Sequence, residues 1–319
     1  MIKRQHTLDI GEGIRAPTRY RPSRADMESK GIHLPPSVVS GSYQCSPPLI
    51  RPSKLTVKEK GGVGKELSDG WNLNFAVGCI HACPFCYVDA IHKRFGESRY
   101  GAPVLGKWGE YFLTPSNLED AIKRTPWGRW EGREVMMSST HDPYLPTLAS
   151  WARRILEAAL PAGVRICLQT RSFLVTKDLE YLAGYAGQVR LQVSLATMNR
   201  DLARLIEPRV PPPDARLEVL RQAKKRGLKV GVILAPIFPP TRVRPDFEAD
   251  LVDLVRRLEG IGPEHVYGES LHVRGENMSL VEKALGEKIL VNAAFDGVAE
   301  GVFRAELEKA QIPGTWWPH

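Results

Sequence analysis

Cysteine is scarce in this sequence, with five residues in a chain of 319. A small, odd number of cysteines in a long chain does not suit the disulfide framework of a small secreted domain. Long apolar runs are missing too: no stretch approaches the roughly 18 apolar residues of a membrane span. Residues 1–23 carry charges but lack the apolar core of a signal peptide. These absences predict a cytoplasmic protein of a reducing compartment, with no membrane segment.

Composition and charge suit one large globular unit. Hydrophobic residues make up 43% of the chain, which is long enough to bury a sizeable core. The formal net charge is +8, and residues 1–70 hold twelve Lys and Arg against seven Asp and Glu, so this stretch contributes +5. A basic arm can attract an anionic partner such as nucleic acid. A solvated, loosely ordered arm would have the same composition, so both interpretations stay open.

The chain changes character near residue 70. Residues 1–69 are rich in Pro, Gly, Ser and Arg with little periodicity, which predicts an extended arm lying over the rest of the protein. After it, short apolar runs with β-branched residues predict six strands, at 72–77, 133–139, 164–170, 189–196, 229–237 and 265–271. Helical patterns separate several of them, at 147–160, 177–185, 214–227 and 246–259.

Strands that alternate with helices in this way form parallel βαβ units of an α/β fold. Six units suggest an open barrel over residues 70–271, followed by a short C-terminal extension at 272–319. A doubly wound sheet is the alternative, and either arrangement places functional residues at the carboxyl ends of the strands. In the helix predicted at 214–227, Asp214 is expected as the N-cap and Gly227 as the residue that ends it.

Three of the five cysteines stand together in the stretch GCIHACPFCYVDA, residues 78–90. Cys79, Cys83 and Cys86 follow the first predicted strand directly. Their loop is therefore expected at the carboxyl edge of the sheet, where chemistry is expected in both candidate folds.

Three kinds of site compete for these thiols. Zinc normally uses two pairs of ligands, whereas this chain has one CxxC pair and would need His81 or His92 as a fourth ligand. A single nucleophilic or redox cysteine would leave its two neighbours redundant. An iron–sulfur cluster takes soft thiolates, and three ligands on a four-iron cluster leave one iron open to another molecule.

The spacing Cys79-xxx-Cys83-xx-Cys86, with aromatic Phe85 and Tyr87 beside the last thiol, resembles the motif of the radical S-adenosylmethionine (SAM) superfamily. The stretches THDPYLP, LQTRSFLVTKDLEYL, VSLATMNRDLARLIEPRVPPPDARLEVL and GVILAPIFP, between residues 140 and 239, are similar to the branch grouped with spore photoproduct lyase, a DNA-repair enzyme. The resemblance implies a partial (β/α)6 TIM-type barrel, a 4Fe-4S cluster, SAM, and an external electron donor of the ferredoxin or flavodoxin type.

The resemblance also assigns residues. It implies that Cys79, Cys83 and Cys86 bind the cluster. Other positions expected to contact SAM are the aromatic Tyr87, Asp142 after the second strand, Arg171 after the third strand as partner of the SAM carboxylate, and Ser194 at the end of the fourth strand.

The sequence departs from the lyase at one position. Photoproduct lyases carry a cysteine at the end of the second strand that returns a hydrogen atom to the substrate, whereas this chain offers Ser138 and Ser139. Cys45, on the arm, is the candidate for a replacement donor. Cys167, inside the third predicted strand, is expected to be a buried apolar residue.

The sequence therefore predicts a radical SAM enzyme that cleaves SAM to a 5′-deoxyadenosyl radical for hydrogen abstraction. The resemblance and the basic arm favour a nucleic acid or nucleotide as substrate, over a peptide or small metabolite. The rival hypothesis is a non-catalytic nucleic-acid-binding protein whose thiols hold a structural metal. Nothing in the sequence indicates the oligomeric state.

Overall fold

The computed structural model describes residues 3–5, 38–53 and 65–317. Its main sheet has the strand order β11-β10-β9-β8-β7-β6-β4-β3. The strands are β3 (Ile50–Pro52), β4 (Trp71–Leu73), β6 (Glu134–Met137), β7 (Arg165–Thr170), β8 (Val189–Ser194), β9 (Lys229–Ile237), β10 (His265–Ser270) and β11 (Gly314–Trp316). All neighbours pair in parallel except β3, which runs antiparallel to β4.

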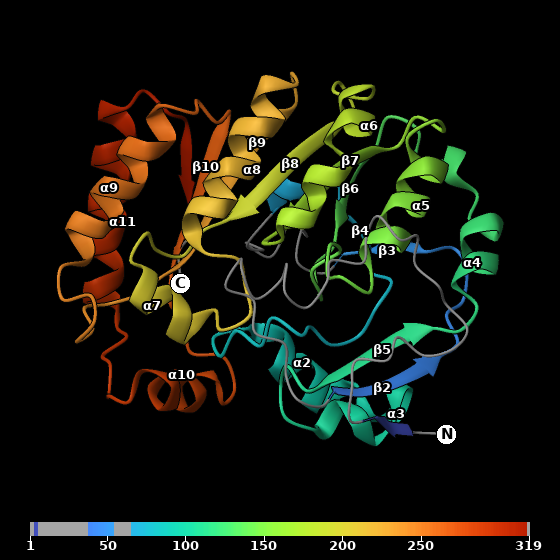
Figure 1. Ribbon diagram of the computed structural model, residues 1–319, viewed down its shortest axis with the longest axis horizontal. Helices are drawn as coiled ribbons and strands as arrows, with labels where there is room; N and C mark the ends of the chain where they lie inside the picture. Colours follow the sequence, from blue (N-terminus) through green and yellow to red (C-terminus); the bar gives the residue numbers. More distant parts are fainter. Residues whose placement is uncertain (1–2, 6–37, 54–64, 318–319) are drawn as a thin grey trace.

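The six predicted strands are confirmed as β4, β6, β7, β8, β9 and β10, and they lie side by side in chain order (Figure 1). A doubly wound sheet would reverse its strand order at a switch point, and this sheet does not. Right-handed crossovers between consecutive neighbours place all the connecting helices on one face. The predicted α/β class is therefore confirmed, in the singly wound arrangement that barrels use.

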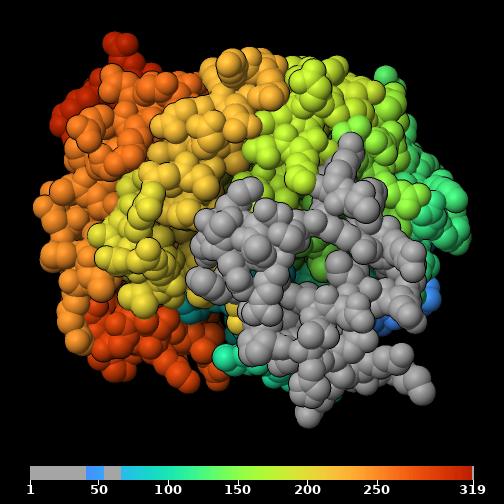
Figure 2. Space-filling view, in the orientation of Figure 1, coloured from blue at the N-terminus to red at the C-terminus, as the bar shows by residue number. Residues whose placement is uncertain are grey.

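The helices between these strands are α5 (Ala149–Ala159), α6 (Leu179–Ala183), α7 (Arg200–Ile206), α8 (Pro213–Lys225) and α9 (Phe247–Glu259), with the 3-10 helix η6 (Phe173–Lys177) before α6. Their side chains form a continuous surface over this side of the molecule, coloured from green to orange in Figure 2. No helix in the described part of the chain is long and apolar enough to cross a membrane.

Of the two ends predicted for the helix at 214–227, which is α8, the C-terminal one is confirmed and the N-terminal one is wrong. Gly227 has a φ of +77° and follows the last turn, as expected of a residue that terminates a helix. The prediction of Asp214 as the N-cap is wrong. The helix starts at Pro213 with Pro212 as the N-cap, so Asp214 is its second residue. Proline suits the first turn because it has no N–H to leave unpaired, and Asp214 instead forms an ion pair with Arg200 at 2.6 Å.

A smaller sheet was not predicted. It consists of β1 (Lys3–Gln5), β2 (Val38–Tyr43) and β5 (Tyr111–Pro115), in that order. Strand β5 belongs to a long connection between β4 and β6, which also holds α2 (Tyr87–Phe95), α3 (Glu97–Tyr100), η4 (Ala102–Leu105), α4 (Leu118–Arg124) and η5 (Trp127–Trp130). The described parts of the N-terminal segment pair with both sheets through β2 and β3, while most of the predicted basic arm lies outside the described residues.

The C-terminal extension joins the main sheet. Its helices α10 (Asn277–Leu285) and α11 (Ala293–Lys309) precede β11, which pairs in parallel with β10. Trp317 follows β11 and stacks on Tyr267 with ring centroids 5.0 Å apart. Its indole N–H donates to Glu66 of η3 (Lys65–Leu67) at 3.1 Å, so the C-terminal end of the described chain contacts the segment that precedes β4.

The two faces of the sheet bury different side chains. Leu168 and Leu191 pack into the main core against the helices. Cys167, which alternates with them, belongs to a separate apolar cluster with Ile233 and Tyr267 on the other face. Cys167 is fully buried, which agrees with the expectation of a packed apolar residue.

Candidate functional site

The three clustered cysteines occupy the loop that follows β4, here named the cysteine loop (residues 78–86). The first strand is shorter than predicted, because β4 ends at Leu73 and Val77 leaves the main sheet to pair with Leu113 of β5. Two successive turns shape the loop, with the N–H of Ala82 donating to Cys79 O at 3.4 Å and the N–H of Cys86 donating to Cys83 O at 3.1 Å.

The cysteine loop is held against the long connection by close backbone contacts. Gly78, at φ +89°, abuts the carbonyl oxygen of Tyr111 so closely that a side chain there would collide with it. Gly109, at φ +86°, abuts Ala82 in the same way, and Ala82 itself has a positive φ of 57°. Both glycine positions combine a positive φ with no room for a Cβ atom, so glycine fits them best.

Arg209 ties the loop to the same connection from the other side. One of its guanidinium nitrogens donates to Ile80 O at 3.3 Å and to Gly109 O at 2.7 Å. Arg209 lies in the segment between α7 and α8, which the sequence analysis did not single out. The loop is therefore fixed by residues from both the long connection and the main sheet's helices.

All three thiols of the loop are free; Cys79 and Cys83 are buried, and Cys86 is partly exposed. Burial raises the pKa of Cys79 to about 12, with Asp142 adding to the effect. Burial also raises the pKa of Cys86 to about 11, although the backbone amide of Val88 in α2 and the Arg171 guanidinium act against it. The pKa of Cys83 is raised well above its usual value by burial, with further contributions from Cys79 and Cys86. The three sulfurs thus share one buried environment, and metal binding there would release protons.

This donor set fits an iron–sulfur cluster. Three soft thiols lie on one loop, and Cys79, Cys86 and the cation Arg171 are all close enough to Cys83 to affect its pKa. The histidines considered for zinc have other contacts. His81 Nδ1 lies 3.7 Å from Asp142, and His92 Nδ1 lies 3.0 Å from the Tyr111 hydroxyl. Within the described segments, no three His, Cys, Asp or Glu side chains are gathered around a point that one ion could occupy.

Asp142 connects the cysteine loop to the ends of β6 and β7. One carboxylate oxygen accepts from the Tyr144 N–H and from the Thr170 hydroxyl, both at 2.8 Å. The other accepts from the backbone N–H of Arg171 at 2.6 Å and faces His81. Asp142 is therefore at the predicted rim, with its oxygens already engaged in holding neighbouring segments together.

Arg171 lies beside the cysteine loop, and its guanidinium group has two hydrogen-bond partners. Its Nε donates to Glu207 at 3.0 Å and one terminal nitrogen donates to Ala235 O at 3.1 Å. Its guanidinium carbon is 5.7 Å from the centre of the Phe85 ring, within the loop. The other terminal nitrogen makes no hydrogen bond to a described residue, which leaves one donor for an anion.

Glu207 is a buried carboxylate that the sequence analysis missed. Its side chain is 1% exposed and bridges Arg171 to Arg216, which is equally buried and donates at 3.1 Å from one terminal nitrogen. Arg216 also donates to Ser194 O at 2.7 Å, so the network reaches the end of β8. Burial alone would raise the pKa of Glu207, but Arg216 and Arg171 hold it below its usual value. Two cations on one carboxylate give this network of three side chains a net charge of +1.

Two further predicted residues lie at the same edge. Ser194 ends β8, and its hydroxyl makes no hydrogen bond to a described residue. Tyr87 is the first residue of α2, and its hydroxyl donates to Ser139 O at 2.6 Å. Ser139 is also bound to Asn74, which lies just after β4. Tyr87 thus links the start of α2 to the end of β6.

Cys45 is not near these groups. Its backbone N–H donates to Asn117 Oδ1 at 3.0 Å and its carbonyl accepts from Asn117 Nδ2 at 2.8 Å, just before α4. Tyr43 of β2 pairs with Pro115 at the end of β5, whereas the cysteine loop abuts Tyr111 at the start of β5. Four strand steps span about 13 Å. The proposed role of Cys45 as hydrogen donor therefore gains no support from its position.

Glu269, also missed from the sequence, faces the site from β10. It lies where the pairing of β10 with β9 shifts register between Gly268 and Ser270, an irregularity that can re-aim a side chain. Burial raises the pKa of Glu269 to about 7, although Arg274 acts against it. Burial raises the pKa of Tyr87, and Cys86 and Glu269 add to this effect, so Glu269 lies within electrostatic reach of the start of α2. No local pattern in the sequence marks this residue, because its setting depends on the bulge.

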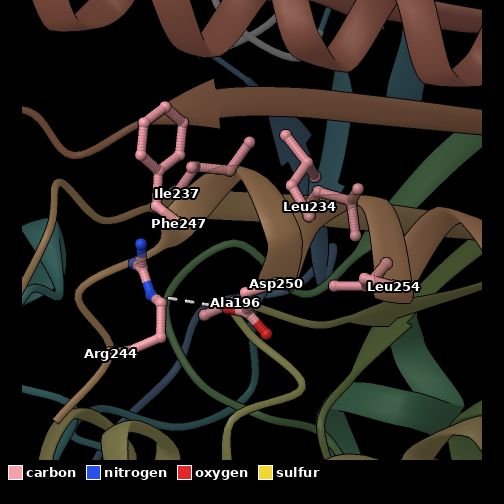
Figure 3. A pocket seen from close by; sticks show the side chains of 8 residues that line it. Ala196, Leu234, Ile237, Arg244, Phe247, Asp250 and Leu254 are labelled. Atoms are coloured by element: carbon pink, nitrogen blue, oxygen red, sulfur yellow. Dashed lines mark ion pairs between the residues drawn. The ribbon is translucent and has the colours of Figure 1, made fainter.

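A small pocket under α9 is a structural feature rather than part of this site (Figure 3). It is lined mainly by apolar side chains. Its two charged residues, Arg244 and Asp250, form an ion pair with the Arg244 Nε 3.5 Å from the Asp250 carboxylate. Burial lowers the pKa of Arg244 to about 10. Asp250 also accepts from the N–H groups of Met198 and Asn199, so the pair fixes the loop after β8.

Comparison with known proteins identifies the family of this fold. The model of the radical SAM superfamily matches residues 73–254. The uncharacterised protein ORF301 of Acidianus two-tailed virus is 59% identical over 277 residues, which cover 87% of this chain and 92% of that protein. The uncharacterised Mycobacterium tuberculosis protein Rv2578c is 27% identical over 212 residues, 64% of this chain and 59% of its own length.

Solved structures show the same fold. A spore photoproduct lyase variant with bound AdoMet and dinucleoside spore photoproduct has a TM-score of 0.60 and 16% identity, covering 98% of this chain and 89% of that one. Another lyase structure, complexed with the dinucleoside photoproduct, has a TM-score of 0.56 and 18% identity, covering 78% and 76%. The open parallel sheet is thus a partial TIM-like barrel, as predicted.

Proposed function

The chain belongs to the radical SAM superfamily and is a radical SAM enzyme, and we propose that Cys79, Cys83 and Cys86 hold a 4Fe-4S cluster at which SAM is reductively cleaved. The observation that carries this proposal is the geometry of the cysteine loop. Three free thiols share one buried environment at the carboxyl edge of the sheet, with Arg171 beside them. In a barrel of this type that edge is where ligands bind.

Cys79, Cys83 and Cys86 would hold the four-iron cluster, which would supply the one electron needed to cleave SAM to methionine and a 5′-deoxyadenosyl radical for hydrogen abstraction from the substrate. The chain's own residues orient the reactants. The free terminal nitrogen of Arg171 would pair with the SAM carboxylate, and Glu207 would keep that guanidinium in place. The Ser194 hydroxyl offers a further polar contact. Asp142 and Tyr87 act through other groups, by holding the strand ends and α2 against the cysteine loop.

Nucleic acid or a nucleotide is the substrate class that we favour, with a peptide or small metabolite as the alternative. Support comes from the net charge of +8 and from the shared fold with a lyase whose solved complex holds a dinucleoside photoproduct. The end of β6 offers no thiol, since Ser138 stands there and its hydroxyl donates to His141 O. The step that returns hydrogen to the product must therefore differ from the one used by photoproduct lyases.

We also place the enzyme in the cytoplasm. All five cysteines are free thiols, and cysteines that remain unpaired suit a reducing compartment.

Anaerobic reconstitution with iron and sulfide tests the proposal. The native protein should be brown, hold about four irons per chain, and convert SAM to 5′-deoxyadenosine and methionine with dithionite as reductant. Cys83→Ala should lose the iron and the cleavage. Cys167→Ala is the matched control, because Cys167 is also buried but belongs to an apolar cluster that contains no residue of the cysteine loop, and it should keep both.

Two outcomes would contradict the proposal. One is a colourless protein with one zinc per chain and no SAM cleavage, which would support a structural metal site. The other is full iron content in Cys83→Ala. With an active enzyme, deuterium transferred from labelled SAM or 5′-deoxyadenosine to a molecule of a cell extract would identify the substrate.

A further inference from the structure

Exposed apolar side chains gather at one place among the described residues. Ile91 and Phe95 of α2 are 39% and 64% exposed, and Leu105 of η4 is 45% exposed. Ile91 and Phe95 are four residues apart and share a helix face, while Gly96 and Val104 bring η4 against α2. Other exposed large apolar residues are spread over separate segments: Val243, Val252, Val273, Leu290 and Val298. Apolar groups that cluster on a surface often mark an interaction site.

Unpaired cations surround these apolar groups. Residues 89–110 contain four Lys and Arg against three Asp and Glu, a net charge of +1, and two of the cations, Lys93 and Lys107, pair with Asp89 and Glu110. The guanidinium carbon of Arg94 lies 4.9 Å from the centre of the Phe95 ring, and that of Arg99 lies 5.2 Å from the Tyr100 ring. Neither arginine forms an ion pair with a described residue. We name the surface formed by Ile91, Arg94, Phe95, Arg99 and Leu105 the α2 patch.

The α2 patch is directly connected to the cysteine loop. Cys86 is the N-cap of α2, and the helix rises about 7.5 Å from there to Ile91. The remaining faces of the helix are covered, with Val88 and His92 in the core and Ala90 against Gly275. Figure 1 shows α2 in the lower part of the molecule, with α3 below it. This face of α2 is therefore a short route from the surface to a ligand of the proposed cluster.

We infer that the α2 patch is the docking site of a small acidic electron-carrier protein. The inference rests on the proposed function, because reductive cleavage consumes one electron for each SAM converted to methionine and radical. The carrier is oxidised by one electron as it delivers that electron through the cysteine loop. An apolar centre with a cationic rim suits a transient complex, since the charges steer an acidic partner and the small apolar area lets it leave again.

A comparison of two reductants tests this inference. The rate of 5′-deoxyadenosine formation is measured on the reconstituted full chain with an acidic flavodoxin, kept reduced enzymatically, and separately with dithionite. The double variant Arg94→Glu, Arg99→Glu should lower the flavodoxin-driven rate by about tenfold or more at low salt. The dithionite-driven rate should stay unchanged, because a small reductant needs no docking surface. The difference from the native protein should shrink as salt screens the charges.

The matched control is the double variant Arg129→Glu, Arg133→Glu. Both arginines are exposed, form no ion pair with a described residue, and lie before β6 at the opposite edge of the sheet from the cysteine loop. This variant changes the net charge equally and should leave both rates unchanged.

Three results would overturn the inference: an unchanged flavodoxin-driven rate in the α2 variant, an equal loss with both reductants, or the same loss in the control. A native protein that cleaves SAM with neither reductant would instead contradict the proposed function.

Discussion

Replacing Glu207 by Gln should destabilise the protein more than any surface change of the same kind. Glu207 is the buried carboxylate that neutralises Arg171 and Arg216. Removing one partner of a buried ionic network costs about 3 to 5 kcal/mol, because the remaining charges are left uncompensated. Gln keeps one acceptor oxygen, so the lower end, about 3 kcal/mol, is expected. For a chain of this size that corresponds to a fall in Tm of about 4 to 5 °C.

Thermal unfolding of the native protein and the variant measures this effect. Glu180→Gln is the control, since Glu180 is 92% exposed and lies 3.7 Å from Arg226, a pair expected to contribute less than about 1 kcal/mol. A loss in Glu207→Gln no larger than in the control would refute the network as described.

The pH dependence gives Glu207 an independent check. Its pKa is held below the usual 4.5 in the folded protein, so its contribution to stability is present above pH 4.5. That contribution is lost as the pH falls from 4.5 through the folded pKa. The variant Glu207→Gln has no carboxylate at this position to titrate. Its free energy of unfolding should therefore fall less than that of the native protein over this acid range. Parallel acid curves for the two proteins would contradict the assignment.

Three further changes test other parts of the site. Arg171→Ala should weaken SAM binding by about 2 kcal/mol, or roughly thirtyfold, as measured by equilibrium dialysis; an unchanged Kd would show that Arg171 does not contact SAM. Gly109→Ala should lower the iron retained after anaerobic desalting, because the new methyl group collides with Ala82, whereas Gly132→Ala adds a methyl group in open space at a similar positive φ and should retain it. Equal losses would mean that the collision is unimportant. Glu269 has a pKa raised by burial from 4.5 to about 7, so its neutral form stabilises the fold below pH 4.5 and this stability is lost as the pH rises through 7. Glu269→Gln should therefore gain up to about 3 kcal/mol relative to the native protein between pH 4.5 and 8, and a constant difference in thermal stability across that range would disprove it.

Local patterns in the sequence were enough to predict the elements and their order. Strands buried on both faces read as short apolar runs with β-branched residues, which is why β6 to β10 were found close to their true bounds. The spacing of Cys79, Cys83 and Cys86 identified the loop and, with the flanking aromatics, the family. Strand β5 was missed because it lies in a long connection and pairs mainly with β2, a partner far away in the sequence.

Only the tertiary structure decided which charged groups meet at the site. Glu207 is surrounded in the sequence by residues typical of a surface loop, and nothing local indicates that it is buried between Arg171 and Arg216. The sequence motifs pointed to Asp142 and Arg171 as positions at the rim, but not to the hydrogen bonds that already occupy them. Spacing along the chain determines which residues share a loop or a helix face, because those distances are local. Burial, charge pairing and the position of Cys45 depend on contacts between separate segments, 36 residues apart for Arg171 and Glu207 and 72 for Cys45 and Asn117, and these form only when the sheet assembles.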